Sequence, residues 1–273
     1  MHWRRHEWNR SFEWHVPDGP YRIITPEQAR AYDDQGFFVL PDAFDADTVA
    51  RVTAEIDPME EQFEAALRSQ PNGRVFIARA DEITFTIHLV LRSPVLRAFC
   101  GHAVFQSLAH DLIGPDVRLY WDQAVYKKPG TTQPFPWHQD NGYTYLEPQQ
   151  YLTCWVALSD ADESNGCPWV VPGVHRLGTL EHRLTDLGFV CTKEQPAGAV
   201  PVPVRAGGIV VFSSLTPHAT GANVTDDVRK TYIVQFAPAG AAVQLAGVSE
   251  RSPGQPANDP DRQFPVLIDG APA

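Results

Sequence analysis

The sequence lacks the features that would place the chain in a membrane, on a secretion route or on nucleic acid. None of its stretches approaches the length of apolar run that crosses a bilayer. The residues before Trp14 include Arg4, Arg5 and Arg10 but no apolar run behind them, so we do not expect a secretory signal. With 22 basic and 33 acidic residues, the net charge of −11 disfavours nucleic acid and anionic membrane surfaces as partners. We therefore expect a cytoplasmic protein that acts on a small molecule. Its oligomeric state is not indicated.

Several common catalytic motifs are missing as well. The sequence contains no Walker loop, no dinucleotide fingerprint and no Gly-x-Ser-x-Gly elbow. His6-Glu7 begins like a zinc-protease motif, but Arg10 stands where the second histidine would be. The four cysteines form no Cys-x-x-Cys pair, and without an export signal we expect buried thiols rather than disulfides. They are Cys100, Cys154, Cys167 and Cys191.

The first 115 residues are predicted to be mostly helical. Thr25-Pro26-Glu27-Gln28 is a capping sequence, which predicts a helix from there to about Asp34 that ends at Gly36. A short buried strand is predicted at 37–40. Asp45 is expected to cap a second helix that Pro58 kinks or ends, and 95–112 is predicted as a further helix.

From about residue 116 to 240 the pattern changes to short strands between Gly, Pro and Asn turns. This pattern predicts a mainly β fold with flanking helices, whose core is a double-stranded β-helix of the jelly-roll or cupin-like kind. We expect a single domain over 1–273, with 178–205 as a candidate lid and 241–273 as an irregular tail. The predicted strands are 117–126, 151–158, 169–171, 209–212 and 229–237.

A candidate metal motif precedes the second of these strands. On a strand, His138 and Asp140 project from the same face and can both reach one ion, whereas on a helix they diverge. Pro134 and Pro136 favour extended backbone here. A lone His-x-Asp is more often a simple hydrogen-bonded pair, so a third ligand is required. His218 can supply it, and two histidines with one carboxylate suit a non-haem Fe(II) oxygenase.

Together with neighbouring motifs, these residues resemble the phytanoyl-CoA dioxygenase family of Fe(II)/2-oxoglutarate-dependent oxygenases. The resemblance covers roughly residues 24–237. His218 and Arg229, eleven positions apart (229 − 218), match the family's distal metal histidine and its 2-oxoglutarate arginine. The other motifs that carry the resemblance are His138-Gln139-Asp140, Trp155-Val156-Ala157-Leu158, Asn165-Gly166-Cys167 and Val171-Pro172-Gly173-Val174-His175.

The resemblance implies a role for each of these residues. His138, Asp140 and His218 would bind Fe(II), which leaves positions for 2-oxoglutarate and O2. Arg229 would form a bidentate pair with the distal carboxylate of 2-oxoglutarate. Its alternative is a surface ion pair with Asp226 or Asp227. Three further residues are candidates for the cosubstrate site. Thr220 would donate its hydroxyl to the same carboxylate of 2-oxoglutarate. Gln123 would donate a hydrogen bond to the cosubstrate or else be a structural amide, and Trp155 would form a wall of the site or else belong to the core.

The implied activity is hydroxylation of an unactivated C–H bond in a small, largely apolar metabolite, with release of succinate and CO2. Aromatic residues near the metal motifs could form the substrate pocket, although about half are expected to be core. Two alternatives remain: a non-catalytic jelly-roll protein that binds metal or ligand, and a zinc hydrolase with the same three ligands, in which Arg229 has no role. The candidate pocket residues are Phe135, Trp137, Tyr143, Tyr145 and Trp169.

Overall fold

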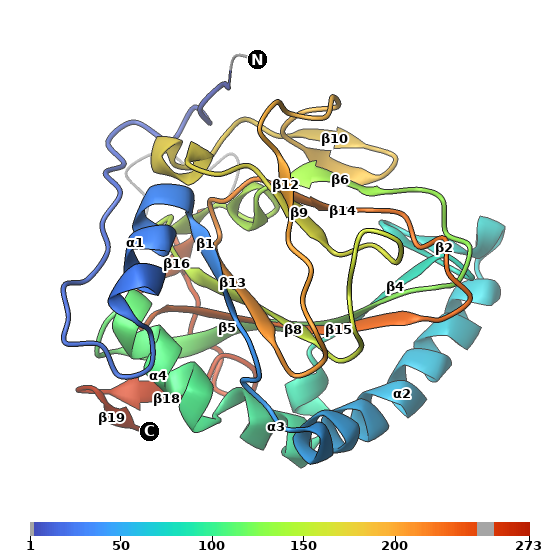
Figure 1. The fold of residues 1–273 in the computed structure, drawn as a ribbon, viewed down its shortest axis with the longest axis horizontal. Coiled ribbons are helices and arrows are strands. Elements are labelled where there is room, and N and C mark those ends of the chain that lie inside the picture. Colours follow the sequence, from blue (N-terminus) through green and yellow to red (C-terminus); the bar gives the residue numbers. More distant parts are fainter. Residues whose placement is uncertain (1–2, 245–253) are drawn as a thin grey trace.

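The computed structural model describes residues 3–244 and 254–273 and has two antiparallel β-sheets as its centre. Helices α2, α3 and α4 lie along the larger sheet, on the side away from the smaller one (Figure 1). The predicted mainly β fold with flanking helices is confirmed. In spatial order, the larger sheet contains β1 (Phe37–Leu40), β13 (Ile209–Ser213), β8 (Leu152–Ala157), β15 (Arg229–Pro238), β5 (Val117–Lys127), β4 (Ile83–Ile87), β3 (Ala78–Arg79) and β2 (Arg74–Val75). The smaller sheet contains β12 (Val200–Pro201), β9 (Pro168–Val170), β14 (His218–Thr220) and β6 (Phe135–His138).

The strand register decides which side chains of the larger sheet face inward. Trp155 on β8, Ile233 on β15 and Gln123 on β5 lie directly opposite one another, and Arg229 lies opposite Lys127. Because side chains alternate along a strand, these five share one face of the sheet. Their neighbours in sequence point to the other face, where Cys154, Val156, Tyr232, Ala124 and Tyr126 join the main core with the helices.

Helix α1 (Pro26–Gln35) begins and ends as predicted. The side chain of Thr25 accepts a hydrogen bond from the Gln28 amide, and the Gln28 side chain accepts one from the Thr25 amide. Gly36 has φ +83°, and a Cβ there would lie 2.5 Å from the His175 ring. Glycine is therefore required at the point where the chain turns from α1 into β1.

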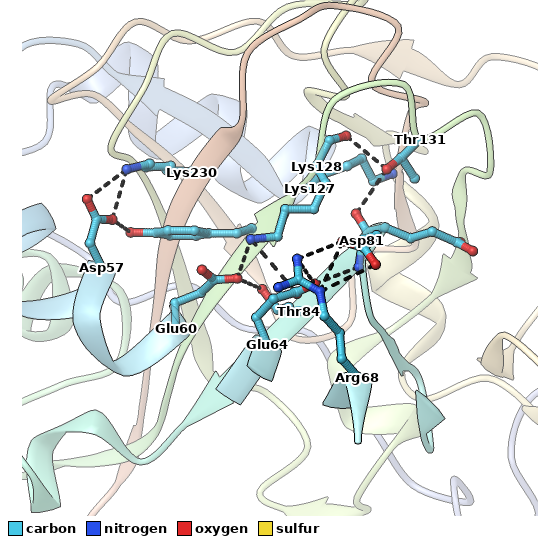
Figure 2. A network of polar contacts seen from close by, with 12 residues as sticks. Asp57, Glu60, Glu64, Arg68, Asp81, Thr84, Lys127, Lys128, Thr131 and Lys230 are labelled. Carbon is cyan, nitrogen blue, oxygen red and sulfur yellow. Dashed lines mark hydrogen bonds and ion pairs between the residues drawn. The ribbon is translucent and has the colours of Figure 1, made fainter. Parts of the chain in front are cut away.

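Helix α2 (Ala46–Arg68) continues through Pro58, so it does not end at this proline, which was one of the two predicted alternatives. A proline inside a helix costs about 3 kcal/mol, because one backbone hydrogen bond is lost and the ring crowds the preceding turn. Ionic contacts on both sides of Pro58 hold the helix on the sheet (Figure 2). Lys230 lies 2.8 Å from Asp57, and Lys128 lies 2.7 Å from the buried Glu60.

Other expectations about the two ends of the chain also need correction. The segment 95–112 forms two helices, α3 (Pro94–Cys100) and α4 (Ala103–Leu112), because His102 caps a new helix by accepting from the Val104 amide. The first 115 residues also contribute β1–β4 to the sheet. The tail is not wholly irregular, since β18 (Pro265–Ile268) pairs with β5 and buries Val266 and Leu267. The part of the tail at 245–253 lies outside the described residues.

The remaining elements are short. Within residues 3–244 and 254–273, no helix combines the length and apolar character needed to span a bilayer. Cys100, Cys154 and Cys167 are buried free thiols, and Cys191 is half-buried. The short strands are β7 (Leu146–Glu147), β10 (Arg183–Thr185), β11 (Gly188–Val190), β16 (Ala242–Val243), β17 (Gln255–Pro256) and β19 (Ala271–Pro272), and the 3-10 helices are η1 (Pro71–Gly73), η2 (Leu89–Leu91), η3 (Asp140–Gly142) and η4 (Val174–Leu177).

Candidate active site

The smaller sheet brings three candidate metal ligands together from distant parts of the sequence. His138 ends β6 and pairs with His218, which begins β14, and Asp140 follows at the start of η3. Oδ1 of Asp140 lies 3.9 Å from Nε2 of His138 and 3.7 Å from Nε2 of His218. All three ligand atoms lie within 4.8 Å of one another. Two ligands at right angles on one ion with bonds of about 2.1 Å are about 3 Å apart, so small side-chain shifts would complete a metal site.

Backbone carbonyls select the tautomer of both histidines. Nδ1 of His138 lies 2.8 Å from the Pro136 carbonyl oxygen, and Nδ1 of His218 lies 2.9 Å from that of Thr216. A carbonyl oxygen can only accept, so Nδ1 carries the proton and the Nε2 lone pair faces the ligand cluster. Burial, followed by the neighbouring His218, lowers the pKa of His138 well below its usual value and keeps it neutral. The donor set therefore fits a divalent metal ion.

Thr153 and Gln235 orient the carboxylate of the third ligand, and sequence reasoning missed both. The hydroxyl of Thr153 lies 2.6 Å from Oδ2 of Asp140 and accepts a hydrogen bond from Nε2 of Gln235 at 3.2 Å. The two residues lie opposite each other on β8 and β15. Since Thr153 is two positions before Trp155, strand alternation alone could have placed it on the inner face.

Arg229 is a buried cation whose hydrogen-bonding capacity is largely unused. Arg229 is 1% exposed, and its Nε and Nη2 have no hydrogen-bond partner among residues 3–244 and 254–273. The guanidinium carbon lies 5.1 Å from the centre of the Trp155 ring. The alternative of an ion pair with Asp226 or Asp227 is not realised, because both are exposed while Arg229 points inward. Leaving a buried charged donor unpaired is costly, so this environment fits an anionic ligand.

A cavity of about 570 Å³ opens beside His138 and Asp140. Of the predicted pocket residues, Phe135 and Tyr143 line it, and so does Gln123. Trp137 and Trp169 pack instead with Val171 and Ala219 in a separate apolar cluster. Tyr145 packs against the rings of His6 and Trp8. Phe189 of the candidate lid also lines the cavity. Much of the remaining wall comes from the segment 75–87, which contributes Val75, Phe76, Ile77, Phe85 and Ile87.

The fold and the site together define a class of protein. Two imidazoles and one carboxylate that could bind one ion, beside a largely apolar cavity, have the composition of the facial triad of non-haem iron oxygenases.

Known proteins agree with this class. A family model described as phytanoyl-CoA dioxygenase (PhyH) matches residues 32–231. Phytanoyl-CoA dioxygenase domain-containing protein 1 of Mus musculus is 25% identical over 275 residues, covering 82% of this chain and 94% of the relative. The crystal structure of the α-ketoglutarate-dependent carbocyclase SnoK from nogalamycin biosynthesis has a TM-score of 0.69 at 27% identity, covering 87% and 96%. That of the epimerase SnoN with Fe3+, α-ketoglutarate and nogalamycin RO has a TM-score of 0.67 at 25% identity, covering 84% and 94%.

The chain belongs to the phytanoyl-CoA dioxygenase (PhyH) family, because the family model spans most of its length. It is a 2-oxoglutarate-dependent non-haem iron oxygenase whose facial triad is His138, Asp140 and His218.

Proposed function

We propose that this oxygenase hydroxylates an unactivated C–H bond of a small, largely apolar metabolite and releases succinate and CO2. The observation that carries the proposal is the cavity beside His138 and Asp140, whose walls are mostly apolar side chains. A pocket of this kind binds a substrate by burying apolar surface, while a few polar groups set its orientation. Thr144, Gln235 and Arg92 are among the polar side chains that line the cavity and are available for that purpose.

We assign the cosubstrate to the inner face of the larger sheet. Arg229 binds the distal carboxylate of 2-oxoglutarate through the N–H groups that lack partners, and Thr220 donates its hydroxyl to the same carboxylate. Trp155, which lies against the guanidinium, forms a wall of this site, and Gln123, on the same face of the sheet, donates a hydrogen bond to the cosubstrate. When bound, iron and 2-oxoglutarate supply the oxidising power that activates O2 for attack on a C–H bond.

The contribution of the protein is to orient the substrate and to exclude water. The Phe135 and Tyr143 rings pack against the imidazole of His138, with centroids 5.0 and 5.3 Å away. Phe189 of the β10–β11 hairpin packs on Tyr143 at 5.4 Å, so aromatic rings separate the metal ligands from solvent on this side. Fixed walls of this kind hold one C–H bond near the reactive position and reduce side reactions.

A second candidate is C–H oxidation without transfer of oxygen. The two solved structures compared above are described as an α-ketoglutarate-dependent carbocyclase and an epimerase in complex with α-ketoglutarate. Ring formation, desaturation and epimerisation begin from the same metal ligands as hydroxylation. The cavity walls, rather than the triad, would then decide the outcome.

The test is a screen of metabolites for substrate-stimulated succinate release by the purified protein with Fe(II), 2-oxoglutarate and air. We expect succinate formation that rises with one class of apolar compound and a product that gains one oxygen atom. A product that has lost two hydrogens, or that is an isomer of the substrate, would instead favour the second candidate. No consumption of 2-oxoglutarate above that of the His218→Ala variant would contradict both and favour a non-catalytic or hydrolytic protein.

A further inference from the structure

We propose that Lys127 is a positioning residue of the cosubstrate site, where it directs the Thr220 hydroxyl toward the distal carboxylate of 2-oxoglutarate and adds a positive charge beside Arg229. This inference rests on the proposed function. Lys127 is neither one of the three metal ligands nor a residue that lines the substrate cavity, so neither of these sites explains its position.

Lys127 is completely buried on the inner face of the larger sheet. It lies at the end of β5, directly opposite Arg229 on β15 and Ile83 on β4. Its Nζ lies 3.3 Å from Oγ1 of Thr220 and 3.4 Å from the Gln133 carbonyl oxygen, and it also donates to the Gly221 carbonyl oxygen. All three partners are neutral oxygen atoms. Among the residues that the structure describes, no carboxylate lies within 4 Å of this ammonium group.

The adjacent lysine provides a contrast. Lys128 points to the opposite face of the sheet, where its Nζ lies 2.7 Å from Glu60 and 3.9 Å from Glu64 (Figure 2). Lys128 therefore has the acidic partners expected of a mostly buried lysine, whereas Lys127 has none. Burying an ammonium group without an anion is unfavourable unless a ligand later supplies the charge.

The charges around Lys127 favour an anion at this position. Burial lowers the pKa of Lys127 to about 6, and the cations Arg229 and Arg79 contribute in the same direction. Arg79 on β3 is itself paired with Glu82 at 2.6 Å, while Thr220 at the end of β14 and Gly221 after it offer Lys127 only neutral oxygen atoms. A carboxylate placed next to Arg229 would raise the pKa of Lys127 again. Ligand binding near neutral pH is therefore expected to be accompanied by proton uptake.

The contacts of Lys127 also indicate how it would act. A protonated ammonium group has three N–H donors and no acceptor, and the three oxygen partners use all of them. The Thr220 oxygen must then accept from Lys127, which leaves the hydroxyl proton free to donate elsewhere. Lys127 would therefore not touch the cosubstrate but would orient the hydroxyl that does.

The test is anaerobic calorimetric titration of the Fe(II)-loaded protein with 2-oxoglutarate at pH 7, in two buffers that differ in enthalpy of ionisation. For the wild type we expect uptake of close to one proton, and for Lys127→Met a loss of that uptake with about tenfold weaker binding. In a Thr220→Val background the same lysine change should weaken binding by much less than tenfold, because the hydroxyl that it orients is gone. Lys127→Arg, which keeps the charge and the donors, should restore much of the affinity.

Lys128→Met is the matched control, because it removes a neighbouring buried lysine that faces away from the site. Its 2-oxoglutarate affinity and proton uptake should equal those of the wild type. Unchanged affinity and proton uptake in a folded Lys127→Met variant would overturn the assignment, as would the absence of proton uptake in the wild type. If the wild type itself binds no 2-oxoglutarate, the proposed function fails. If the wild type binds it, and Arg229→Ala weakens binding while Lys127→Met changes neither affinity nor proton uptake, the role of Lys127 alone is refuted.

Discussion

The Thr153 hydroxyl lies 2.6 Å from Oδ2 of Asp140, while the other carboxylate oxygen, Oδ1, faces the two imidazoles. Because a carboxylate can only accept, Thr153 donates this hydrogen bond and Gln235 donates to the threonine oxygen in turn. The carboxylate is thus fixed with one oxygen occupied and the other available to a metal ion. Removing a hydrogen bond that holds a metal ligand in place commonly weakens metal binding.

Thr153→Val should therefore lower the affinity for Fe(II) by about tenfold or more, because the Asp140 carboxylate loses the hydrogen bond from the Thr153 hydroxyl. Competition with a chelator of known affinity under anaerobic conditions measures this directly. Thr153→Ser keeps the hydroxyl and should remain close to the wild type. Equal Fe(II) affinity for the serine and valine variants would refute this role of Thr153.

Arg229→Ala should weaken 2-oxoglutarate binding at least about tenfold, since charge-assisted hydrogen bonds are lost. Metal content should not change, because Arg229 is not a metal ligand. Arg229→Lys should recover only part of the affinity, because an ammonium group cannot form the bidentate contact that a guanidinium group makes with a carboxylate. Calorimetric titration with 2-oxoglutarate, together with iron analysis of the same samples, measures both quantities. If neither quantity changes in the alanine variant, our assignment of Arg229 is wrong.

The close approach of Gly188 to Tyr143 should control the shape of the substrate cavity. Gly188 has φ +110°, and a Cβ there would lie 2.4 Å from the Tyr143 hydroxyl and 2.9 Å from Ile77. Gly188→Ala is expected to displace the hairpin that carries Phe189 and to raise KM for the substrate, while 2-oxoglutarate affinity is retained. Gly198→Ala is the matched control, because φ there is +81° and nothing lies within 4 Å of the added carbon. Equal KM values for the two variants would mean that the hairpin does not shape the pocket.

Asp122 should make the stability of the ligand-free protein depend on pH. Burial raises the pKa of this carboxyl to about 6. The folded state then binds a proton more tightly than the unfolded chain, so the free energy of unfolding falls as pH rises from 4 to 6, by about 2–3 kcal/mol for a shift of about two pKa units. Asp122→Asn cannot titrate, so its stability relative to the wild type should rise over the same interval. Chemical denaturation at pH 4 and pH 7 tests this, and a difference that does not change with pH would count against it.

Local rules predicted the features that depend on neighbouring residues. Thr25 and Gln28 cap α1 because capping needs only four consecutive residues. The extended backbone predicted between His138 and Asp140 is present at Gln139 and brings the two side chains together, although Asp140 itself begins η3 and does not lie on the strand. The third ligand, His218, was a candidate because the motif requires another ligand, and the resemblance to a family supported it. Its pairing with His138 is a property of the sheet, which no local pattern contains.

The features that were missed depend on contacts between distant segments. Pro58 is tolerated because Lys230 and Lys128, far away in sequence, hold both halves of α2. In the sequence, nothing distinguishes Lys127 from other lysines beside a turn. Only the pairing of β5 with β15 places it opposite Arg229. Similarly, Trp137 follows an aromatic pattern that suggests a pocket wall, but the pairing of β6 with β14, which itself pairs with β9, directs it into an apolar cluster.

The most direct test of the central claim is the stoichiometry of Fe(II) binding under anaerobic conditions, compared between the wild type and His218→Ala. We expect one Fe(II) per wild-type chain and a loss of most of this binding in the variant, because His218 is one of only three protein ligands. His15→Ala, which changes an exposed histidine, serves as the control and should bind like the wild type. Full Fe(II) binding by the folded His218→Ala protein would contradict the account.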